Sequence, residues 1–300
     1  MTQPYGAKDR PDWRGQPWLT WLAMAAAVIV FVGIKLTPLD STEDPTLRWG
    51  YQPAEVLWTG TWWPLLTSPF VHLAVFHIAF NLYWLFLLGS RMEKTVGPLR
   101  YLAFFALAAF VSSAAELAFS DQMGIGLSGV VYAIFGFMWP LRERYPEFRE
   151  VVDDRTLKAF LFWMAICVPL TYLKIMNVAN AAHVSGLVFG SLVAYGFGLK
   201  PKHLWATLAT VGLVGLSFVP LLWMPWSRDW LATAAFEAHQ AGRYPEAIRR
   251  YTQLIDKDPS NSWALFNRAV AFHRAGDPEK ALADLKRARE LDPTVTDTDE

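Results

Sequence analysis

The sequence of 300 residues is poor in charge, since only 18% of its residues are Asp, Glu, Lys or Arg. Three long stretches, residues 56–90, 122–141 and 175–199, contain none of these residues. The single cysteine, Cys167, excludes an intramolecular disulfide framework, and the formal net charge of +0 excludes a general attraction to nucleic acid. Hydrophobic residues make up 53% of the chain, with 15 Trp and 20 Phe. This composition is typical of a membrane protein.

Seven apolar stretches come close to the roughly 20 residues that a helix needs to cross the hydrocarbon core of a bilayer. They cover residues 17–36, 68–89, 101–119, 124–140, 157–173, 178–199 and 204–224. The first is too long for a cleaved signal peptide, lacks a convincing cleavage site and is followed by further spans. The sequence therefore predicts an all-α fold, a polytopic bundle of membrane helices.

The orientation follows from Lys and Arg, which favour the cytoplasmic ends of membrane helices. They gather before the first stretch and after the second, fourth and sixth: Lys8, Arg10, Arg14; Arg91, Lys94, Arg100; Arg142, Arg144, Arg149, Arg155, Lys158; Lys200, Lys202. The opposite connections carry only Lys35, Arg48 and Lys174. We therefore expect the amino terminus in the cytoplasm and the opposite connections outside.

Two residues of the apolar stretches can carry chemistry near the outer face. With this orientation, Ser128 in GIGLSGVVYAIFGF is expected four to seven residues into the fourth span, and His183 a few residues into the sixth. The two side chains would lie at similar depth. An ionisable residue inside a membrane span indicates function by default. For either residue alone, a hydrogen bond within the helix bundle is the competing explanation.

The second span adds three polar side chains. In SPFVHLAVFHIAFNLYW, His77 and Asn81 are four residues apart and therefore on one helical face, and His72 precedes them by five residues. His77 and Asn81 can donate hydrogen bonds to the oxyanion of an acyl-transfer intermediate in a site that excludes water. Each alone is better explained by interhelical hydrogen bonding. Together with a G-x-S-G motif and a histidine on a third span, they favour acyl transfer.

The segments HLAVFHIAFN, GLSGVVYAIFG and AHVSGLVFG, in this order, resemble the rhomboid intramembrane serine proteases. The resemblance covers roughly residues 17–200 and implies a rhomboid-like core of six helices, with a seventh span after it. It implies Ser128 as the nucleophile and His183 as the general base. Neither a cofactor nor a metal is implied.

The same resemblance implies roles for further residues. Asn81, His77 and the backbone N–H of Ser128 match the oxyanion donors, and Tyr132 matches the aromatic residue that packs on the catalytic histidine. The small residues match positions of close helix packing: Gly126, Gly129, Gly186 and Gly190. LLGSRMEKTVGPLR resembles the family's segment after the second span, where Glu93 and Gly97 are expected to be structural.

One departure concerns the loop LWTGTWWPLLTSPF, which has Trp63-Pro64 where many relatives have Trp-Arg, so the packing of this loop is expected to differ. Its Trp58, Trp62 and Trp63 suit the membrane interface. Glu116 is the only acidic residue well inside an apolar span. We therefore expect a Ser-His dyad with no carboxylate completing a triad.

Rival chemistries lack their residues. The sequence has no H-E-x-x-H zinc motif and no pair of aspartates within the spans. A rhomboid-like scaffold that binds membrane clients without cutting them is the main alternative, although such a protein is expected to lack the serine or the histidine. A transporter is less favoured, because no repeated halves or pair of broken helices is evident.

A second pattern appears in the charged region after about residue 228. Gly242, Ala247 and Pro259 recur 34 residues later, as Gly276, Ala281 and Pro293. This period resembles tetratricopeptide (TPR) repeats. The resemblance implies a small soluble α-helical domain of two repeats that holds a peptide or protein partner. A spacer or a dimer contact is the alternative.

These observations divide the chain into a cytoplasmic amino terminus (1–16), a membrane protease core (17–200), a seventh transmembrane helix (201–227), two repeats (228–295) and a tail (296–300). Because residues 204–224 carry no charge, we expect them to span and to place the repeats outside. An interfacial helix that leaves the repeats in the cytoplasm is the alternative. The expected location is a bacterial plasma (inner) membrane. The expected substrates are single-span membrane proteins cut near the outer face.

Overall fold

The computed structural model describes residues 15–38, 44–197 and 204–295. The described residues form helices joined by loops and contain no strand, so the prediction of an all-α fold is confirmed. The chain divides into two compact units. One comprises residues 1–53 and 62–220, and the other residues 54–61 and 221–300. The lysines and arginines predicted to mark the cytoplasmic side at residues 8, 10, 14, 200 and 202, and the tail 296–300, lie outside the described residues.

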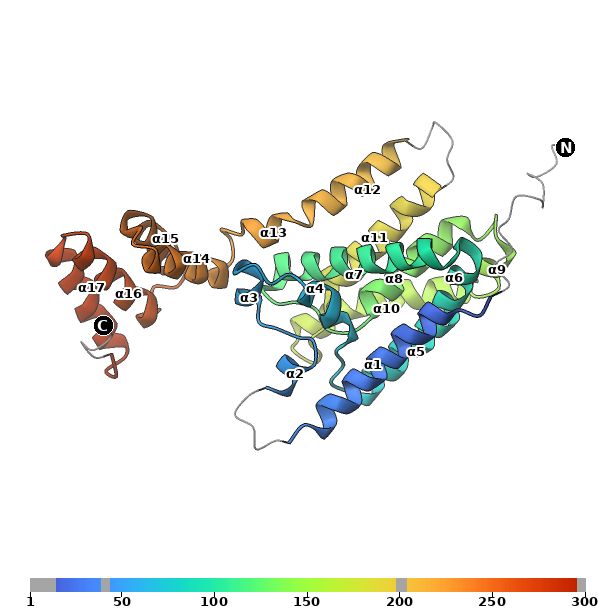
Figure 1. The fold of residues 1–300 in the computed structure, drawn as a ribbon, viewed down its shortest axis with the longest axis horizontal. Coiled ribbons are helices and arrows are strands. Elements are labelled where there is room, and N and C mark those ends of the chain that lie inside the picture. Colours follow the sequence, from blue (N-terminus) through green and yellow to red (C-terminus); the bar gives the residue numbers. More distant parts are fainter. Residues whose placement is uncertain (1–14, 39–43, 198–203, 296–300) are drawn as a thin grey trace. The chain divides into compact units, whose positions relative to one another are not determined.

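The first unit contains the apolar helices (Figure 1). Its elements are α1 (Trp18–Leu36), α2 (Pro45–Arg48), α4 (Pro64–Thr67), the short helix η1 (Ser68–Phe70), α5 (Val75–Trp84), the π-helical turn η2 (Leu85–Gly89), α6 (Ser90–Val96), α7 (Pro98–Ser120), α8 (Ser128–Leu141), α9 (Pro146–Arg149), α10 (Asp154–Tyr172), α11 (Asn180–Phe197) and α12 (Leu204–Leu216). The chain passes to the second unit within α13 (Val219–Leu222).

All seven predicted spans correspond to helices, but these differ in length. Within the described residues, three helices are long and apolar enough to cross a membrane: Trp18–Leu36, Pro98–Ser120 and Leu204–Leu222. Pro64–Phe70 and Val75–Val96 form a pair bent by 102°, which would make a fourth span if the two count together. The remaining predicted spans are occupied by α8, α10 and α11, of which α8 is the shortest.

The second span was predicted to begin at residue 68, and this start is wrong. α5 begins at Val75, after an extended segment that ends at Ala74 with φ −120° and ψ 142°. His72 therefore lies in this segment, not on the helix with His77 and Asn81. Pro69 explains part of the difference, because its ring lacks an N–H and fits only the first turn of a helix, here η1.

The fourth span was predicted to begin at residue 124, which is also wrong. Ser128 is the first residue of α8, not four to seven residues inside it. Gly126 has φ +95°, a conformation open to glycine and costly for other residues, and this breaks any helix before residue 127. Irregular backbone at membrane depth is stable where it lines a cavity, and residues 122–125 line the cavity described below.

The helix of the seventh span, Leu204–Leu222, contains a two-residue turn at residues 217–218. α12 ends at Leu216 and helical structure resumes only at Val219. Pro220 explains this position, because a proline ring clashes with the carbonyl four residues earlier, which here belongs to Leu216.

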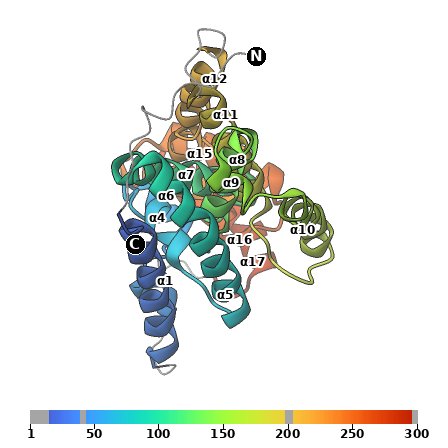
Figure 2. The ribbon, with the colours of Figure 1, turned by 90° about the vertical axis from the view of Figure 1, so that its right-hand side faces the viewer.

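α8 packs mainly on α11, and α7 contacts both of these helices, whereas α10 lies at one margin of the bundle (Figure 2). Three glycines bring α8 and α11 into backbone contact. A Cβ on Gly186 would meet the carbonyl oxygen of Gly129, and one on Gly190 would meet that of Ala133. Gly136 of α8 faces the backbone of Leu187 in the same way. Backbone contact at these glycines therefore determines how closely the two helices approach each other.

A buried carboxylate holds the start of α1. Glu93, on α6, is 3% exposed. It accepts hydrogen bonds from the backbone N–H groups of Leu19 (3.0 Å) and Thr20 (2.8 Å) and from the Thr20 hydroxyl (2.8 Å). No side chain of the residue before α1 caps the helix. Glu93 therefore satisfies N–H groups that would otherwise be unpaired at the helix start.

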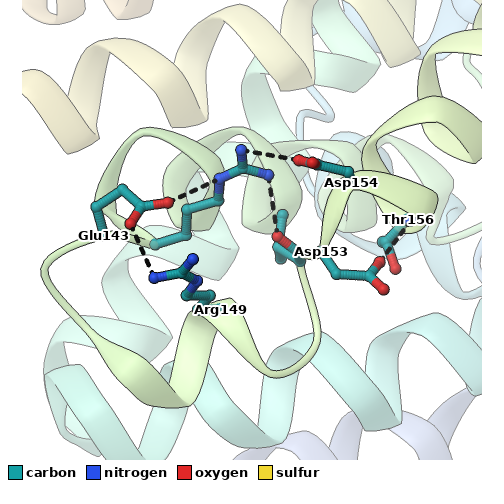
Figure 3. Close-up of polar contacts among 7 residues, drawn as sticks. Glu143, Arg149, Asp153, Asp154 and Thr156 are labelled. Atoms are coloured by element: carbon teal, nitrogen blue, oxygen red, sulfur yellow. Dashed lines mark hydrogen bonds and ion pairs between the residues drawn. The ribbon is translucent and has the colours of Figure 1, made fainter.

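The connection between α8 and α10 is held by charged groups (Figure 3). Arg142 donates to the carbonyl of Val152 (3.3 Å) and pairs with Asp154 (3.0 Å), while Arg149 pairs with Glu143 (3.2 Å). Asp153 caps α10 by accepting the backbone N–H of Thr156 at 2.8 Å, and this bond lowers the pKa of the Asp153 carboxyl. These contacts hold together the loop between α8 and α10.

The second unit contains α3 (Ala54–Trp58) and two helical hairpins. The hairpins are α14 (Arg228–Gln240) with α15 (Tyr244–Lys257), and α16 (Ser262–Arg274) with α17 (Pro278–Leu291). Gly242 (φ +70°) and Gly276 (φ +85°) form the two equivalent turns, as the 34-residue period requires. Arg268 and Asp284 form a bidentate ion pair, at 2.7 and 2.9 Å, that joins α16 to α17.

The backbone contact between α8 and α11 predicts a large effect of one methyl group. We expect Gly190→Ala to destabilise the protein by about 1–3 kcal/mol, because the new Cβ can fit only if the helices move apart. Thermal unfolding in detergent micelles measures this effect. The matched control is Gly212→Ala in α12, where nothing lies within 4 Å of the added Cβ. Equal melting temperatures for the two variants would contradict the prediction.

Candidate active site

A cavity of about 790 Å³ opens within the first unit. Side chains and backbone from α5, α7, α8 and α11 and from the loops that precede α8 and α11 form its wall. The wall includes five of the site residues predicted from the sequence, His77, Asn81, Ser128, Tyr132 and His183, and two acidic residues, Asp44 and Glu116. Residues from the second, third, fourth and sixth predicted spans therefore share one space.

Ser128 and His183 are in hydrogen-bond contact, although they are 55 residues apart in the sequence. The distance between Ser128 Oγ and His183 Nε2 is 2.7 Å. His183 is the fourth residue of α11 and is 3% exposed, whereas Ser128 is the first residue of α8 and is partly accessible. A serine hydroxyl bonded to an imidazole nitrogen is the arrangement that activates a serine nucleophile.

The other ring nitrogen of His183 has no hydrogen-bond partner. Its Nδ1 is buried, and no described residue offers it an acceptor. The ring instead packs on Tyr132, with the ring centres 4.7 Å apart and the planes inclined by 30°. The Tyr132 hydroxyl donates to the carbonyl of Phe160 at 3.0 Å, and this bond fixes the tyrosine. Packing on Tyr132 therefore orients the His183 ring, which is one of the roles that a carboxylate has in a triad.

His77 and Asn81 lie on the wall of the same cavity. The Asn81 amide is 2% exposed, and its Nδ2 donates one hydrogen bond to the carbonyl of His77 at 2.9 Å. An amide nitrogen carries two hydrogens, so one remains for a further acceptor. The His77 imidazole fills the space where a Cβ on Gly126 would lie. The glycine thus admits a polar ring close to Ser128.

His72 holds the residue that precedes the serine. Its Nδ1 lies 3.0 Å from the carbonyl of Phe70, and its Nε2 lies 3.4 Å from the backbone N of Leu127. A carbonyl can only accept, so Nδ1 must donate and Nε2 must accept the Leu127 N–H. No role in the site was predicted for His72 from the sequence. Only the structure connects it to the Ser128 loop.

The glycines selected from the sequence all lie at close contacts. A Cβ on Gly129 would approach Ser112 to 2.7 Å, so α7 contacts α8 at the residue that follows Ser128. Gly186 and Gly190 form the backbone contact of α11 with α8 described above. Gly126 supplies the turn before Ser128 through its positive φ. The glycines therefore allow the close contacts that surround the serine and the histidine.

Glu116 and Phe160 also contribute to the site, although no role for either was predicted from the sequence. Glu116 lines the cavity, and its Oε2 accepts the backbone N–H of Ala182, next to His183, at 3.1 Å. A carboxylate within an apolar run was the available signal. Phe160 contributes a backbone carbonyl and a ring, which no sequence pattern indicates. Across the described ranges 15–38, 44–197 and 204–295, no group of three or more His, Cys, Asp or Glu could hold a metal ion.

Comparison with known proteins links this geometry to a family. Residues 59–200 match the family model described as Rhomboid domain, and residues 233–295 match that of a tetratricopeptide repeat. Rhomboid protease GlpG of Serratia proteamaculans is 36% identical over 180 residues, and GlpG of Yersinia pestis (strain Pestoides F) is 35% identical over the same length. Each match covers 59% of this chain and 62% of the relative. With the apolar helices, these similarities identify a multi-pass membrane protein.

The 2.7 Å contact predicts that Ser128 is unusually reactive. We expect a fluorophosphonate probe to label the purified protein at Ser128, because His183 can accept the hydroxyl proton as the oxygen attacks. Ser128→Ala should abolish labelling, and His183→Ala should slow it by about a thousandfold or more.

Ser217→Ala is the matched control for this experiment, since Ser217 is a buried serine that does not line the cavity and donates its hydroxyl to the carbonyl of Leu213. We expect it to be labelled at a rate near that of the wild type. The measurement is in-gel fluorescence against time, with the labelled peptide identified by mass spectrometry. Undiminished labelling of Ser128→Ala would show that the reactive group lies elsewhere.

Proposed function

We propose that this protein is an intramembrane serine endopeptidase with Ser128 and His183 as its dyad, because residues 59–200 match the Rhomboid domain model. The observation that carries the proposal is the 2.7 Å contact between Ser128 Oγ and His183 Nε2 on the wall of the cavity. The chain spans 62% of the length of the curated relatives it matches. Their activity therefore supports the proposal without deciding it.

The reaction begins with Ser128. Its Oγ forms a bond to the carbonyl carbon of the scissile peptide while His183 Nε2 takes the hydroxyl proton. The carbon–nitrogen bond then breaks, and His183 gives the proton to the leaving amine. In the second half, water attacks the acyl-enzyme, His183 takes a proton from it, and Ser128 regains the proton as the acid product leaves.

The negative charge that develops on the carbonyl oxygen needs donors. We assign this role to the free Asn81 amide hydrogen, to the His77 ring and to the backbone N–H of Ser128. Ser128 is the first residue of α8, and the first N–H groups of a helix have no partner within it. The position of these groups on the cavity wall supports the assignment.

Hydrolysis requires water at a depth where lipid would exclude it. The cavity supplies room for water, and its polar residues can hold water against the surrounding hydrocarbon. A peptide bond in a regular helix is shielded by its own backbone hydrogen bonds, so a substrate must unwind to reach Ser128. We therefore propose single-span membrane proteins as substrates, cut near the outer face at a locally weak helix.

The orientation and the second unit complete the proposal. We place the protein in a bacterial plasma membrane with its amino terminus in the cytoplasm, using the domain boundaries predicted above. The charge-free stretch 204–224 would then carry the tetratricopeptide repeats to the outer side. There they would hold a peptide segment of a partner or substrate.

Cleavage of a model transmembrane substrate in proteoliposomes tests the proposed activity. We expect Ser128→Ala and His183→Ala to abolish cleavage, because each removes one half of the dyad. Asn81→Ala should lower kcat by about 100-fold with little change in KM, since its amide would serve the transition state.

Melting temperatures of the variants control for folding in this experiment. A folded Ser128→Ala protein that still cleaves would rule out the serine mechanism. If the wild type binds the substrate and leaves it intact, the protein is a rhomboid-like scaffold and not a protease.

A cysteine at Ser260, in a Cys167→Ala background, tests the side of the repeats. Ser260 is exposed between α15 and α16, whereas Cys167 is buried. We expect a membrane-impermeant maleimide to label Ser260→Cys in intact spheroplasts, because the seventh span would end outside. Glu150→Cys, in the exposed loop before α10, is the control and should react only after permeabilisation. The reverse pattern for Ser260→Cys would place the repeats inside.

A further inference from the structure

We propose that Glu116 is a positioning residue for the Ser128–His183 pair, acting through the first turn of α11. The proposal rests on the serine endopeptidase function proposed above. Glu116 lies near the end of α7, is 8% exposed and lines the cavity that contains the dyad. It does not contact His183 Nδ1, whose lack of a partner was noted above. Its effect must therefore pass through the backbone.

The contact that transmits this effect is a hydrogen bond to the residue before His183. The backbone N–H of Ala182 donates to Glu116 Oε2 at 3.1 Å. Ala182 lies in the first turn of α11, where N–H groups have no partner within the helix. A carboxylate is favoured at this end of a helix, because the peptide dipoles leave partial positive charge there.

The residue before α11 is Ala179, whose methyl side chain cannot accept a hydrogen bond. The Asn180 Nδ2 donates to the Thr171 hydroxyl (2.8 Å) and to the carbonyl of Val178 (3.1 Å). Its amide thus joins α11 to the end of α10. The cap for Ala182 comes instead from α7, and α7 is thereby tied to the helix that carries His183.

Glu116 also packs against the loop that leads to Ser128. A Cβ on Gly124 would lie 3.3 Å from Glu116 Cγ and 3.1 Å from the Cβ of Ala179. The serine loop, the carboxylate of α7 and the segment before α11 therefore meet at one point. A change at Glu116 would alter the position of both reacting groups relative to each other.

The dyad depends on such a restraint more than a triad would. No carboxylate bonds to His183 Nδ1, so the orientation of the His183 ring follows from the Tyr132 ring and from the backbone of its own turn. Small displacements of reacting atoms have large effects on rate, since about 1 Å can cost about 100-fold. Holding Ala182 in place therefore supports the 2.7 Å contact between Ser128 and His183.

A second carboxylate provides a matched control. Glu93 accepts the N–H groups at the start of α1 just as Glu116 does for α11, and it is similarly buried. Glu93 is not among the residues that line the cavity. Both residues stabilise a helix start, and only Glu116 does so beside the dyad.

The test compares Glu116→Ala, Glu116→Gln and Glu93→Gln in the full-length protein, with the model substrate in proteoliposomes. We expect Glu116→Ala to lower kcat by about 10- to 100-fold with KM nearly unchanged, because the substrate still binds to a misaligned pair. Glu116→Gln should recover kcat to within about fivefold of the wild type, since its amide oxygen can accept the Ala182 N–H more weakly. Glu93→Gln should lower the melting temperature and leave kcat per folded enzyme unchanged.

Three results would overturn the proposal. The first is a wild-type kcat for Glu116→Ala. The second is a loss of activity that matches the loss of folded protein, which would make Glu116 structural only. The third is a Glu116→Gln variant as slow as Glu116→Ala, which would exclude the hydrogen bond as the cause. A wild-type protein that neither cleaves nor reacts with the fluorophosphonate would instead refute the proposed function itself.

Discussion

The site depends on how closely the backbones of α8 and α11 approach. Ser128 begins one helix and His183 lies in the first turn of the other. A side chain at Gly186 or Gly190 would separate the helices, because each glycine faces a carbonyl of α8 with no room for a Cβ. In a bilayer, lipid contacts with apolar helices are as favourable as helix contacts, so close packing of small residues is the principal attraction. The short distance between serine and histidine is therefore a consequence of this packing.

The polar groups at this depth are stabilised by one another. Ser128 contacts His183, His72 accepts the N–H of Leu127, and Glu116 accepts that of Ala182. An unpaired polar group in hydrocarbon costs several kcal/mol, so these bonds stabilise polar groups at the starts of α8 and α11 and in the non-helical segments that contain His72 and Leu127. The loops that precede α8 and α11 are stabilised by the helices around the cavity, α5, α7, α8, α10 and α11. The packing that stabilises these loops therefore also positions the proposed reacting groups.

Periodicity and composition predicted the all-α fold, the approximate positions of the helices and the two hairpins that follow Arg228. Boundaries were predicted less well where the apolar run continues through a loop. Residues 124–127 are as apolar as a helix, yet the positive φ of Gly126 starts α8 only at Ser128. Val71–Ala74 misled the prediction in the same way, and His72 lies in this segment. Hydropathy measures the surroundings of a residue and not its backbone conformation.

The sequence by itself determined which side chains can do chemistry, because a serine, histidines and an asparagine within apolar runs are too costly to occur without partners. It also determined that small residues line one face of α11, through the spacing of Gly186 and Gly190. Only the tertiary structure decided which groups meet. The hydrogen bond between His183 and Ser128 joins residues 55 positions apart, and that from Ala182 to Glu116 joins residues 66 positions apart. The lack of a partner for His183 Nδ1 likewise depends on which side chains surround it. Such contacts follow from the packing of whole helices, and no local pattern records them.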